Sequence, residues 1–258
     1  MLAVIAGTGI EKLAAWDTSK EHVIQTKYGG ASFHEVKVNG NTVFFLPRHS
    51  GDHSIAPHLI NHKANIAALK KIGTKRIIAT CSVGSLRTDL TPGSIVLLSD
   101  FISAAGGNID SFFSVPGSLV VHTDLSTPYC NNLRCVIEKA CKTLSVPLVS
   151  SGTYVGVTGP RYETPAEVRA YRIWGGDVVG MTNVPECILA REAGLCYSAI
   201  AVVTNLGTGL DTCGLSHGDV TRAAQSALPT IEQIIQTVIP EMEYLPECSC
   251  QANTVDIN

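Results

Sequence analysis

A nearly continuous apolar run, Leu195–Thr204, is the feature that most restricts what this 258-residue chain can fold into. A strand with apolar side chains on both faces is typical of the middle of a sheet that helices cover. Apolar residues recur at helical spacing in 131–144 and again in 216–238. Pro229 is expected to kink the second of these helices. The sequence therefore predicts an α/β fold with a twisted mixed β-sheet flanked by helices.

Shorter patterns predict the other elements. Alternation around Asn39-Gly40-Asn41 predicts a hairpin, and helical spacing with a stop at Gly73 predicts a helix over 57–72 whose polar side carries His58 and His62. Neither an internal repeat nor a linker divides the chain, so we expect one domain over 1–240 and a tail over 241–258. The remaining predicted strands are 1–6, 33–38, 42–46, 76–80, 94–98, 153–157 and 177–181.

Two turn-to-helix starts bracket the segment 159–186. Thr164 is a natural N-cap, and with Pro165 at the first helical position and Glu167 three residues after the cap it predicts a capping box. A second helix is expected after Thr182 or Asn183, with Glu186 placed to close its box. Such loops at strand ends are where α/β proteins usually bind ligands.

Composition excludes several classes of function. A net charge of -3 leaves no electrostatic footprint for nucleic acid or an anionic membrane. No apolar run approaches the ~20 residues that span a bilayer, and the N-terminal segment lacks the basic region of a signal peptide. We expect a cytoplasmic protein with no nucleic-acid or membrane partner.

The nine cysteines indicate reduced chemistry more than a disulfide framework. Four of them lie in apolar segments and are interpreted as small core residues: Cys135, Cys141, Cys187 and Cys196. Cys248-Ser249-Cys250 lies in a polar tail, where a tight disulfide or a metal site are both open. No partner CxxC or histidine cluster supports zinc, so the expectation is an idle or redox-tuned tail and no metal.

Polar residues follow one predicted strand after another, and such loops gather at one edge of an open α/β sheet. Gly7-Thr8-Gly9 can hold an anion but is no dinucleotide fingerprint, because Lys12 stands where the third glycine belongs. One group of residues suits inorganic phosphate: Thr8, Arg48, His49, Ser82 and Thr182. A second group, Tyr162, Glu163 and Asn205, suits a planar heterocycle, with Met181 against a sugar.

The motifs GTGI, PRHSGDHS, GPRYETPAE, WGGDVVGMTNVPE and ILAREAGLCY together resemble the trimer-forming nucleoside phosphorylases, over nearly all of residues 1–240. That family comprises purine nucleoside phosphorylase and methylthioadenosine phosphorylase. The resemblance implies the phosphate site just named, a ribose contact at Met181 and a stacking ring at Tyr162. It also implies His217 near the 5′-hydroxyl, His53 and His122 reaching a neighbouring subunit, and a homotrimer or a hexamer of two trimers.

The two branches of the family are mixed in this chain. Adjacent Arg48-His49 and Met181-Thr182 are similar to the methylthioadenosine branch, whereas Glu163 and Asn205 look like the purine-nucleoside branch. A 6-oxopurine offers an N1–H that ionised Glu163 can accept, and Asn205 can donate to O6 or N7. Adenine has no hydrogen on N1, so two hydrogen-bond acceptors, N1 and the carboxylate, would face each other. Such a mismatch can cost ~10⁴-fold in selectivity.

The expected activity is therefore reversible phosphorolysis of inosine or guanosine to base and ribose 1-phosphate, without metal or organic cofactor. Asn205, Glu163 and His217 are the expected catalytic residues, with phosphate as co-substrate. A 5′-methylthioadenosine or 5′-methylthioinosine phosphorylase is the alternative within the family. A nicotinamide-dependent oxidoreductase and a non-catalytic nucleoside-binding protein are the alternatives from other classes.

Overall fold

Strand β9 (Cys196–Leu206) contains the apolar run and is buried over its first nine residues. In the computed structural model of the chain it pairs in parallel with β5 (Arg76–Ser85) and antiparallel with β6 (Ile95–Ser103). The prediction of a central strand is confirmed. The structure describes residues 1–7, 19–50, 54–105, 111–114, 120–210, 217–251 and 257.

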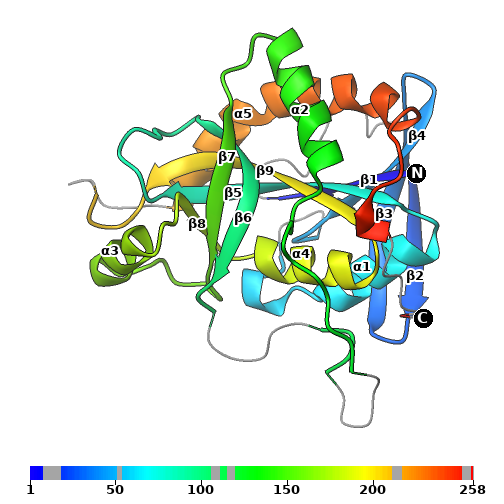
Figure 1. Ribbon diagram of the computed structural model, residues 1–258, viewed down its shortest axis with the longest axis horizontal. Coiled ribbons are helices and arrows are strands. Elements are labelled where there is room, and N and C mark those ends of the chain that lie inside the picture. Colours follow the sequence, from blue (N-terminus) through cyan, green and yellow to red (C-terminus); the bar gives the residue numbers. More distant parts are fainter. Residues whose placement is uncertain are drawn as a thin grey trace.

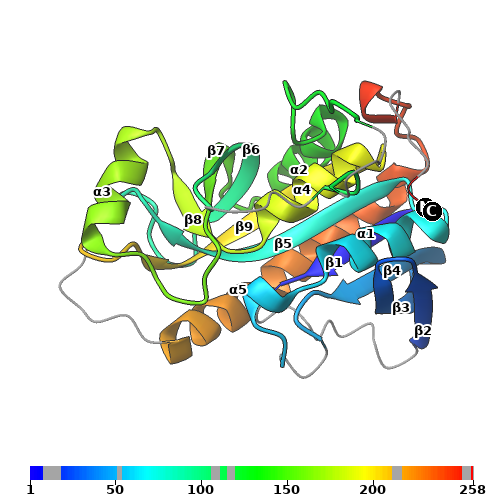
Figure 2. The same ribbon diagram turned by 90° about the horizontal axis from the view of Figure 1, so that it is seen from below.

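All the described strands belong to one mixed sheet (Figures 1 and 2). The other strands are β1 (Leu2–Ala6), β2 (Lys20–Thr26), β3 (Gly29–Val38), β4 (Asn41–Pro47), β7 (Val149–Gly156) and β8 (Val178–Gly180). Their order is β2-β3-β4-β1-β5-β8-β7-β6-β9, and β9 pairs back onto β5. Five strands (β5, β8, β7, β6 and β9) therefore close into a ring, from which the other four extend.

Helices cover both faces of the sheet, as the α/β class requires (Figure 1). On one face α1 (His62–Lys71) and α4 (Asn183–Glu192) pack through residues such as Ile66 and Leu189. On the other face lie α2 (Asn131–Thr143) and α5 (His217–Val238), which contains Pro229. The third helix, α3 (Pro165–Ile173), packs beside β7 and β8. None of the helices in the described part of the chain has the length and apolar character needed to cross a membrane.

The helix predicted over 57–72 is two elements. A 3-10 turn, η2 (Pro57–Leu59), is followed by Ile60 in an extended conformation, and Asn61 then caps α1 by accepting from the Ala64 N–H at 3.0 Å. Because α1 begins only after Asn61, its buried and exposed faces differ from those of a helix that starts at Pro57. His58 is exposed as expected, but His62 is only 5% exposed, so its predicted place on the polar side is wrong.

The capping box at α3 is confirmed. The Thr164 hydroxyl accepts from the Glu167 N–H at 3.2 Å, and the Glu167 carboxylate accepts from the Thr164 N–H at 2.8 Å. At α4 Thr182 is the N-cap, as expected, but its side chain makes no cap bond and the box predicted with Glu186 does not form. Glu186 is instead fully buried and turned towards the centre of the molecule.

The segment after α5 returns to the sheet. Two 3-10 turns, η3 (Ile239–Met242) and η4 (Ser249–Gln251), pack Met242 and Cys250 against the core under α2 and α5. Among the cysteines interpreted as core residues, Cys135 is exposed on α2, which corrects that assignment.

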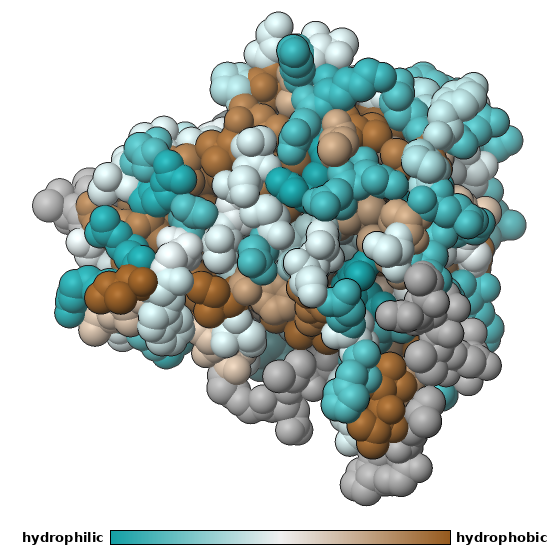
Figure 3. Space-filling view, in the orientation of Figure 1, coloured by the Kyte–Doolittle hydropathy of each residue, from teal (hydrophilic) through white to brown (hydrophobic). Residues whose placement is uncertain are grey.

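Large apolar side chains are exposed at the end of α3, at Ile173 and Trp174. Figure 3 shows brown, hydrophobic residues on the surface over this helix.

Candidate active site

A cavity of about 370 Å³ opens where the segments after β4, β7 and β8 and the end of β9 meet β5. Its volume suits a small organic ligand, since pockets of about 300–1,000 Å³ are usual for such molecules. The cavity brings together eight of the residues singled out from the sequence: Arg48, His49, Ser82, Tyr162, Glu163, Met181, Thr182 and Asn205. Phosphate-type donors and base-type groups therefore share one enclosure.

The other four singled-out residues are not placed in this cavity. Thr8 and His53 lie outside the described residues. His217 is the first residue of α5, and its side chain is also outside the described part, although Val220 from the next turn of that helix lines the cavity. His122 is exposed and is not among the lining residues.

Arg48 is held by a buried ion pair with Glu186. Its Nε and Nη2 both donate to the Glu186 carboxylate, the second at 2.9 Å, and Nη1 donates to the Thr80 carbonyl at 2.9 Å. Both side chains are 1% exposed. Burial alone would lower the pKa of Arg48, but the carboxylate outweighs it and raises that pKa. Of the five N–H groups of a guanidinium, two remain for a ligand.

A hydrogen-bonded network of buried polar side chains fixes Glu186 in turn. The Tyr197 hydroxyl donates to Glu186 Oε2 at 2.8 Å and accepts from Asn183 Nδ2 at 2.9 Å. His62 Nδ1 lies 3.7 Å from Glu186 Oε1. Because the Tyr197 hydroxyl bonds to both Glu186 and Asn183, it holds the Glu186 carboxylate, and through it Arg48, in one orientation. Local spacing predicted only a capping role for Glu186, because its partner Arg48 lies 138 residues away.

Hydroxyl and imidazole groups stand beside Arg48. His49 Nδ1 is 2.8 Å from the Ile55 carbonyl oxygen, which can only accept, so the proton belongs on Nδ1. The Thr182 N–H donates to the buried Tyr154 hydroxyl at 3.2 Å, and this fixes the backbone that carries the Thr182 side chain. Ser82 is half-buried within β5. One cation and several donors in a desolvated pocket suit an oxyanion.

Glu163 is 7% exposed, directly before the Thr164 cap that fixes the start of α3. Burial raises the pKa of its carboxyl. A desolvated carboxyl at a cavity wall favours partners that satisfy it by hydrogen bonding. The neighbouring Tyr162 ring is half-buried and lines the same wall.

Asn205 sits near the end of β9 with its amide orientation set by two contacts. Thr204 Oγ1 donates to Asn205 Oδ1 at 2.9 Å, and Asn205 Nδ2 donates to the Leu206 carbonyl at 2.9 Å. One N–H of the amide remains for a ligand. Its strand neighbour in β5 is Gly84, where an added Cβ would come within 3.1 Å of Asn205 Nδ2. The glycine therefore leaves room for the amide.

The family profile described as the Phosphorylase superfamily matches residues 2–240. The chain belongs to the phosphorylase superfamily. Within this superfamily, the 6-oxopurine nucleoside phosphorylase of Pyrococcus furiosus is 39% identical over 255 residues, which cover 97% of this chain and 96% of the relative. The probable 6-oxopurine nucleoside phosphorylase of Dictyoglomus turgidum is 38% identical over 250 residues, covering 97% and 95%.

Solved structures of the superfamily share the fold. The methylthioadenosine phosphorylase from Schistosoma mansoni in complex with adenine matches with a TM-score of 0.90 and 28% sequence identity. The match covers 98% of this chain and 95% of that one. The resemblance identified from the sequence motifs is confirmed, as is the α/β fold class.

Proposed function

We propose that the chain catalyses the reversible phosphorolysis of 6-oxopurine nucleosides, releasing the free base and ribose 1-phosphate. The observation that carries this proposal is the shared cavity: Glu163 and Asn205 line the same enclosure as Arg48, His49 and Thr182. A nucleoside-binding protein without catalysis would have no use for the phosphate-type group. The names of the relatives with 38–39% identity support the same class of substrate.

Base recognition in this proposal uses one acceptor and one donor. The ionised Glu163 carboxylate accepts the N1–H of a 6-oxopurine, and the remaining Asn205 amide N–H donates to N7 or O6. As the glycosidic bond breaks, negative charge grows on the purine, and the Asn205 N–H stabilises it. Tyr162 stacks on the base.

Phosphate is the nucleophile of the proposed reaction. The two remaining Arg48 N–H groups, His49, Ser82 and Thr182 hold it, and an oxygen of the phosphate bonds to C1′ as the C1′–N9 bond gives its electron pair to the purine. The departing glycosyl carbon has oxocarbenium character, which the adjacent phosphate anion stabilises. The base takes up a proton from solvent. The reaction as written calls for neither a metal ion nor an organic cofactor.

The apolar part of the cavity favours a second candidate at the 5′ end. Ile55 and Val220 line the wall and would accept a methylthio group as readily as they would border a hydroxyl. A 5′-methylthioinosine or 5′-methylthioadenosine phosphorylase is that candidate. His217, if it meets the 5′-hydroxyl as proposed, favours the simple nucleoside. Replacing His217 with Val should then lower activity on inosine more than on methylthioinosine, and equal losses would contradict its role.

A substrate panel assayed with and without phosphate tests the function. Inosine and guanosine should release base only when phosphate is present, with kcat/KM well above that of adenosine and methylthioadenosine. Faster cleavage of the two adenine nucleosides would overturn the substrate class. Release of base without phosphate would overturn the reaction class.

The assembly is proposed to be a homotrimer or a hexamer, in which His53 and His122 approach a neighbouring active site. His122 is exposed on the isolated chain, as a residue with a partner-facing role would be. Sedimentation velocity measures the assembly directly, and a monomer at assay concentration would contradict it.

A further inference from the structure

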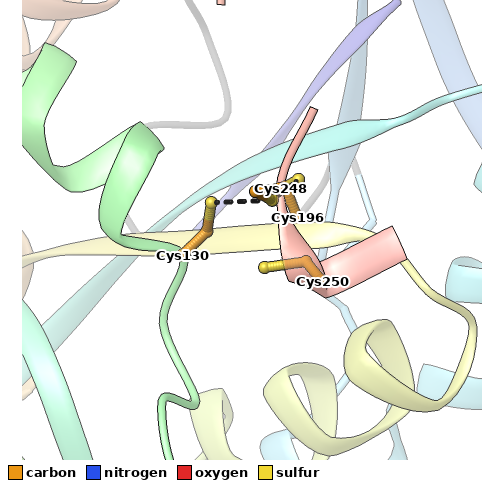
Figure 4. A group of neighbouring side chains, drawn as sticks. All are labelled: Cys130, Cys196, Cys248 and Cys250. Atoms are coloured by element: carbon orange, nitrogen blue, oxygen red, sulfur yellow. Dashed lines mark hydrogen bonds between the residues drawn. The ribbon is translucent and has the colours of Figure 1, made fainter. Parts of the chain in front are cut away.

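Four cysteines gather outside the cavity. The Sγ atoms of Cys130, Cys196, Cys248 and Cys250 all lie within 4.8 Å of one another. Figure 4 shows that they come from three segments: the N-cap of α2 (Cys130), the first residue of β9 (Cys196) and the C-terminal segment at η4 (Cys248 and Cys250). The interpretation of Cys248 and Cys250 as an idle tail rested on the lack of a nearby CxxC. Their partners are distant in sequence, 118 residues away for Cys130 and 52 for Cys196.

The spacing of the sulfurs suits a tetrahedral ion. The Sγ atoms of Cys130 and Cys248 are 3.7 Å apart, and those of Cys196 and Cys248 are 3.1 Å apart. Zinc–sulfur bonds of about 2.3 Å place tetrahedral thiolate sulfurs about 3.8 Å from each other. One or two disulfides would draw the sulfurs into bonded pairs, whereas here all four cysteines are free and every pair of sulfurs lies within 4.8 Å.

The surroundings of the four cysteines are those of a structural site. Cys130 is 1% exposed and Cys196 is 2% exposed, and both belong to the apolar core under α2 and α5. Gln251 Nε2 donates to Cys196 Sγ at 3.8 Å, which is the kind of outer hydrogen bond that orients a thiolate ligand. The set is all sulfur and closed, with no protein oxygen among its members.

A cation lies on the strand beside the cluster. Arg76 of β5 is the register partner of Cys196 in β9. Its guanidinium donates to the carbonyls of Met242 and Leu245, at 3.2 Å and 2.6 Å, in the segment that leads to Cys248. Arg76 thereby anchors the returning tail and brings positive charge to a place where four thiolates and a divalent ion would leave a charge of about −2.

We propose that Cys130, Cys196, Cys248 and Cys250 bind one Zn²⁺ ion, which fastens the C-terminal segment to α2 and β9. Four thiols lose four protons and form four Zn–S bonds, with no oxidation or reduction. Soft thiolate ligands in a tetrahedral set select zinc over hard cations. The site is structural, because four protein ligands leave no open position for a substrate.

Metal analysis of the full-length protein tests the proposal. Protein produced with added zinc and purified under a phosphine reductant, without chelator, should contain one zinc per chain by mass spectrometry of the elements. Cys250→Ser and Cys130→Ser should each lower that content by at least ~10-fold, the loss that even an outer-shell change can cause. Cys135→Ser, which removes an exposed thiol of α2 outside the cluster, is the matched control and should keep its zinc.

Cobalt provides a readout that does not depend on how the variants fold. Wild-type protein stripped by a chelator and given Co²⁺ should show thiolate-to-cobalt charge transfer and the strong visible bands of tetrahedral cobalt. Stripping should also lower the Tm by roughly 5–10 °C. Absence of the cobalt bands, iron in place of zinc, or a disulfide between cluster cysteines in the reduced protein would overturn the assignment.

Discussion

The Glu186 carboxylate accepts from two nitrogens of the Arg48 guanidinium, which lines the cavity, and neither side chain is more than 1% exposed. The charge of Arg48 is therefore compensated within the protein, and only part of its guanidinium is available to a ligand in the cavity. The pair sets the angle at which the two remaining N–H groups meet a ligand.

Removing the negative member of this pair should destabilise the protein. In Glu186→Gln a buried guanidinium loses its counter-charge, which typically costs about 3–5 kcal/mol. Urea denaturation measures the difference in the free energy of unfolding. Glu241→Gln is the control, because Glu241 pairs with Lys139 on the surface at 3.2 Å and should cost less than about 1 kcal/mol. Equal costs at the two sites would contradict this account.

The same pair predicts the response to acid. Burial alone would raise the pKa of Glu186, but Arg48 outweighs it and lowers the pKa below the ordinary 4.5. Because the folded pKa is the lower one, the stabilisation is complete above about pH 4.5 and is lost as the pH falls through the lowered value. Wild-type protein should lose more unfolding free energy between about pH 5 and 3 than Glu186→Gln does. Parallel curves for the two proteins would argue against a charged pair.

Glu163 should make substrate choice depend on pH. Its carboxyl has a raised pKa through burial. Below that pKa the neutral carboxyl accepts more weakly from the N1–H of inosine, whereas its O–H can donate to the bare N1 of adenosine. The adenosine-to-inosine ratio of kcat/KM should therefore rise on acidification. Glu163→Gln should lower kcat/KM for inosine by roughly 10²- to 10³-fold and abolish the change of the ratio. A ratio that is flat with pH in the wild type would exclude this role.

Two hydroxyls should act on phosphate more than on the nucleoside. Ser82→Ala and Thr182→Val each remove one candidate hydrogen bond to a charged ligand. We expect the KM for phosphate to rise about 10-fold in each variant, corresponding to about 1.4 kcal/mol. The KM for inosine should change less than about 3-fold. Steady-state kinetics with one substrate varied at a time decides the matter, and an inverted pattern would move these residues to the nucleoside half.

Thr204 is expected to act through Asn205 as a positioning residue. Its hydroxyl is 2.9 Å from Asn205 Oδ1 and 3.2 Å from the Val83 carbonyl, and Thr204→Val keeps the shape of the side chain while removing both contacts. The kcat for inosine should fall about 10-fold, and the KM for phosphate should hold. Thr204→Ser should restore most of the rate because it returns the hydroxyl. If serine and valine behave alike, packing is the only contribution of Thr204.

Patterns carried by neighbouring residues were predictable from the sequence. The apolar run of β9, the hairpin of β3 and β4, and the Thr164 capping box each depend on residues within one element, so local spacing identified them. β2 was missed, since Lys20-Glu21-His22 offers little of the apolar alternation expected of a strand. Its strand conformation comes from pairing with β3.

Contacts between residues that are distant in the sequence could not be predicted from local spacing. Glu186 satisfies the spacing of a capping box, yet the buried charge of Arg48 is the stronger partner. His62 was assigned to a polar face by helical spacing, but the helix begins only after Asn61 and turns the ring inward. The cysteine cluster was not predicted for the same reason, because its four residues come from three separate segments.

The pairing of β9 back onto β5 has a consequence for how copies of the chain can meet. Of the strands in the described ranges, β2 alone has a single neighbour, so it is the one place where another chain could extend the sheet. Lys20 and Glu21 are exposed there, and such charges disfavour strand addition. An assembly of this protein would therefore be joined by side chains of helices and loops rather than by a shared sheet.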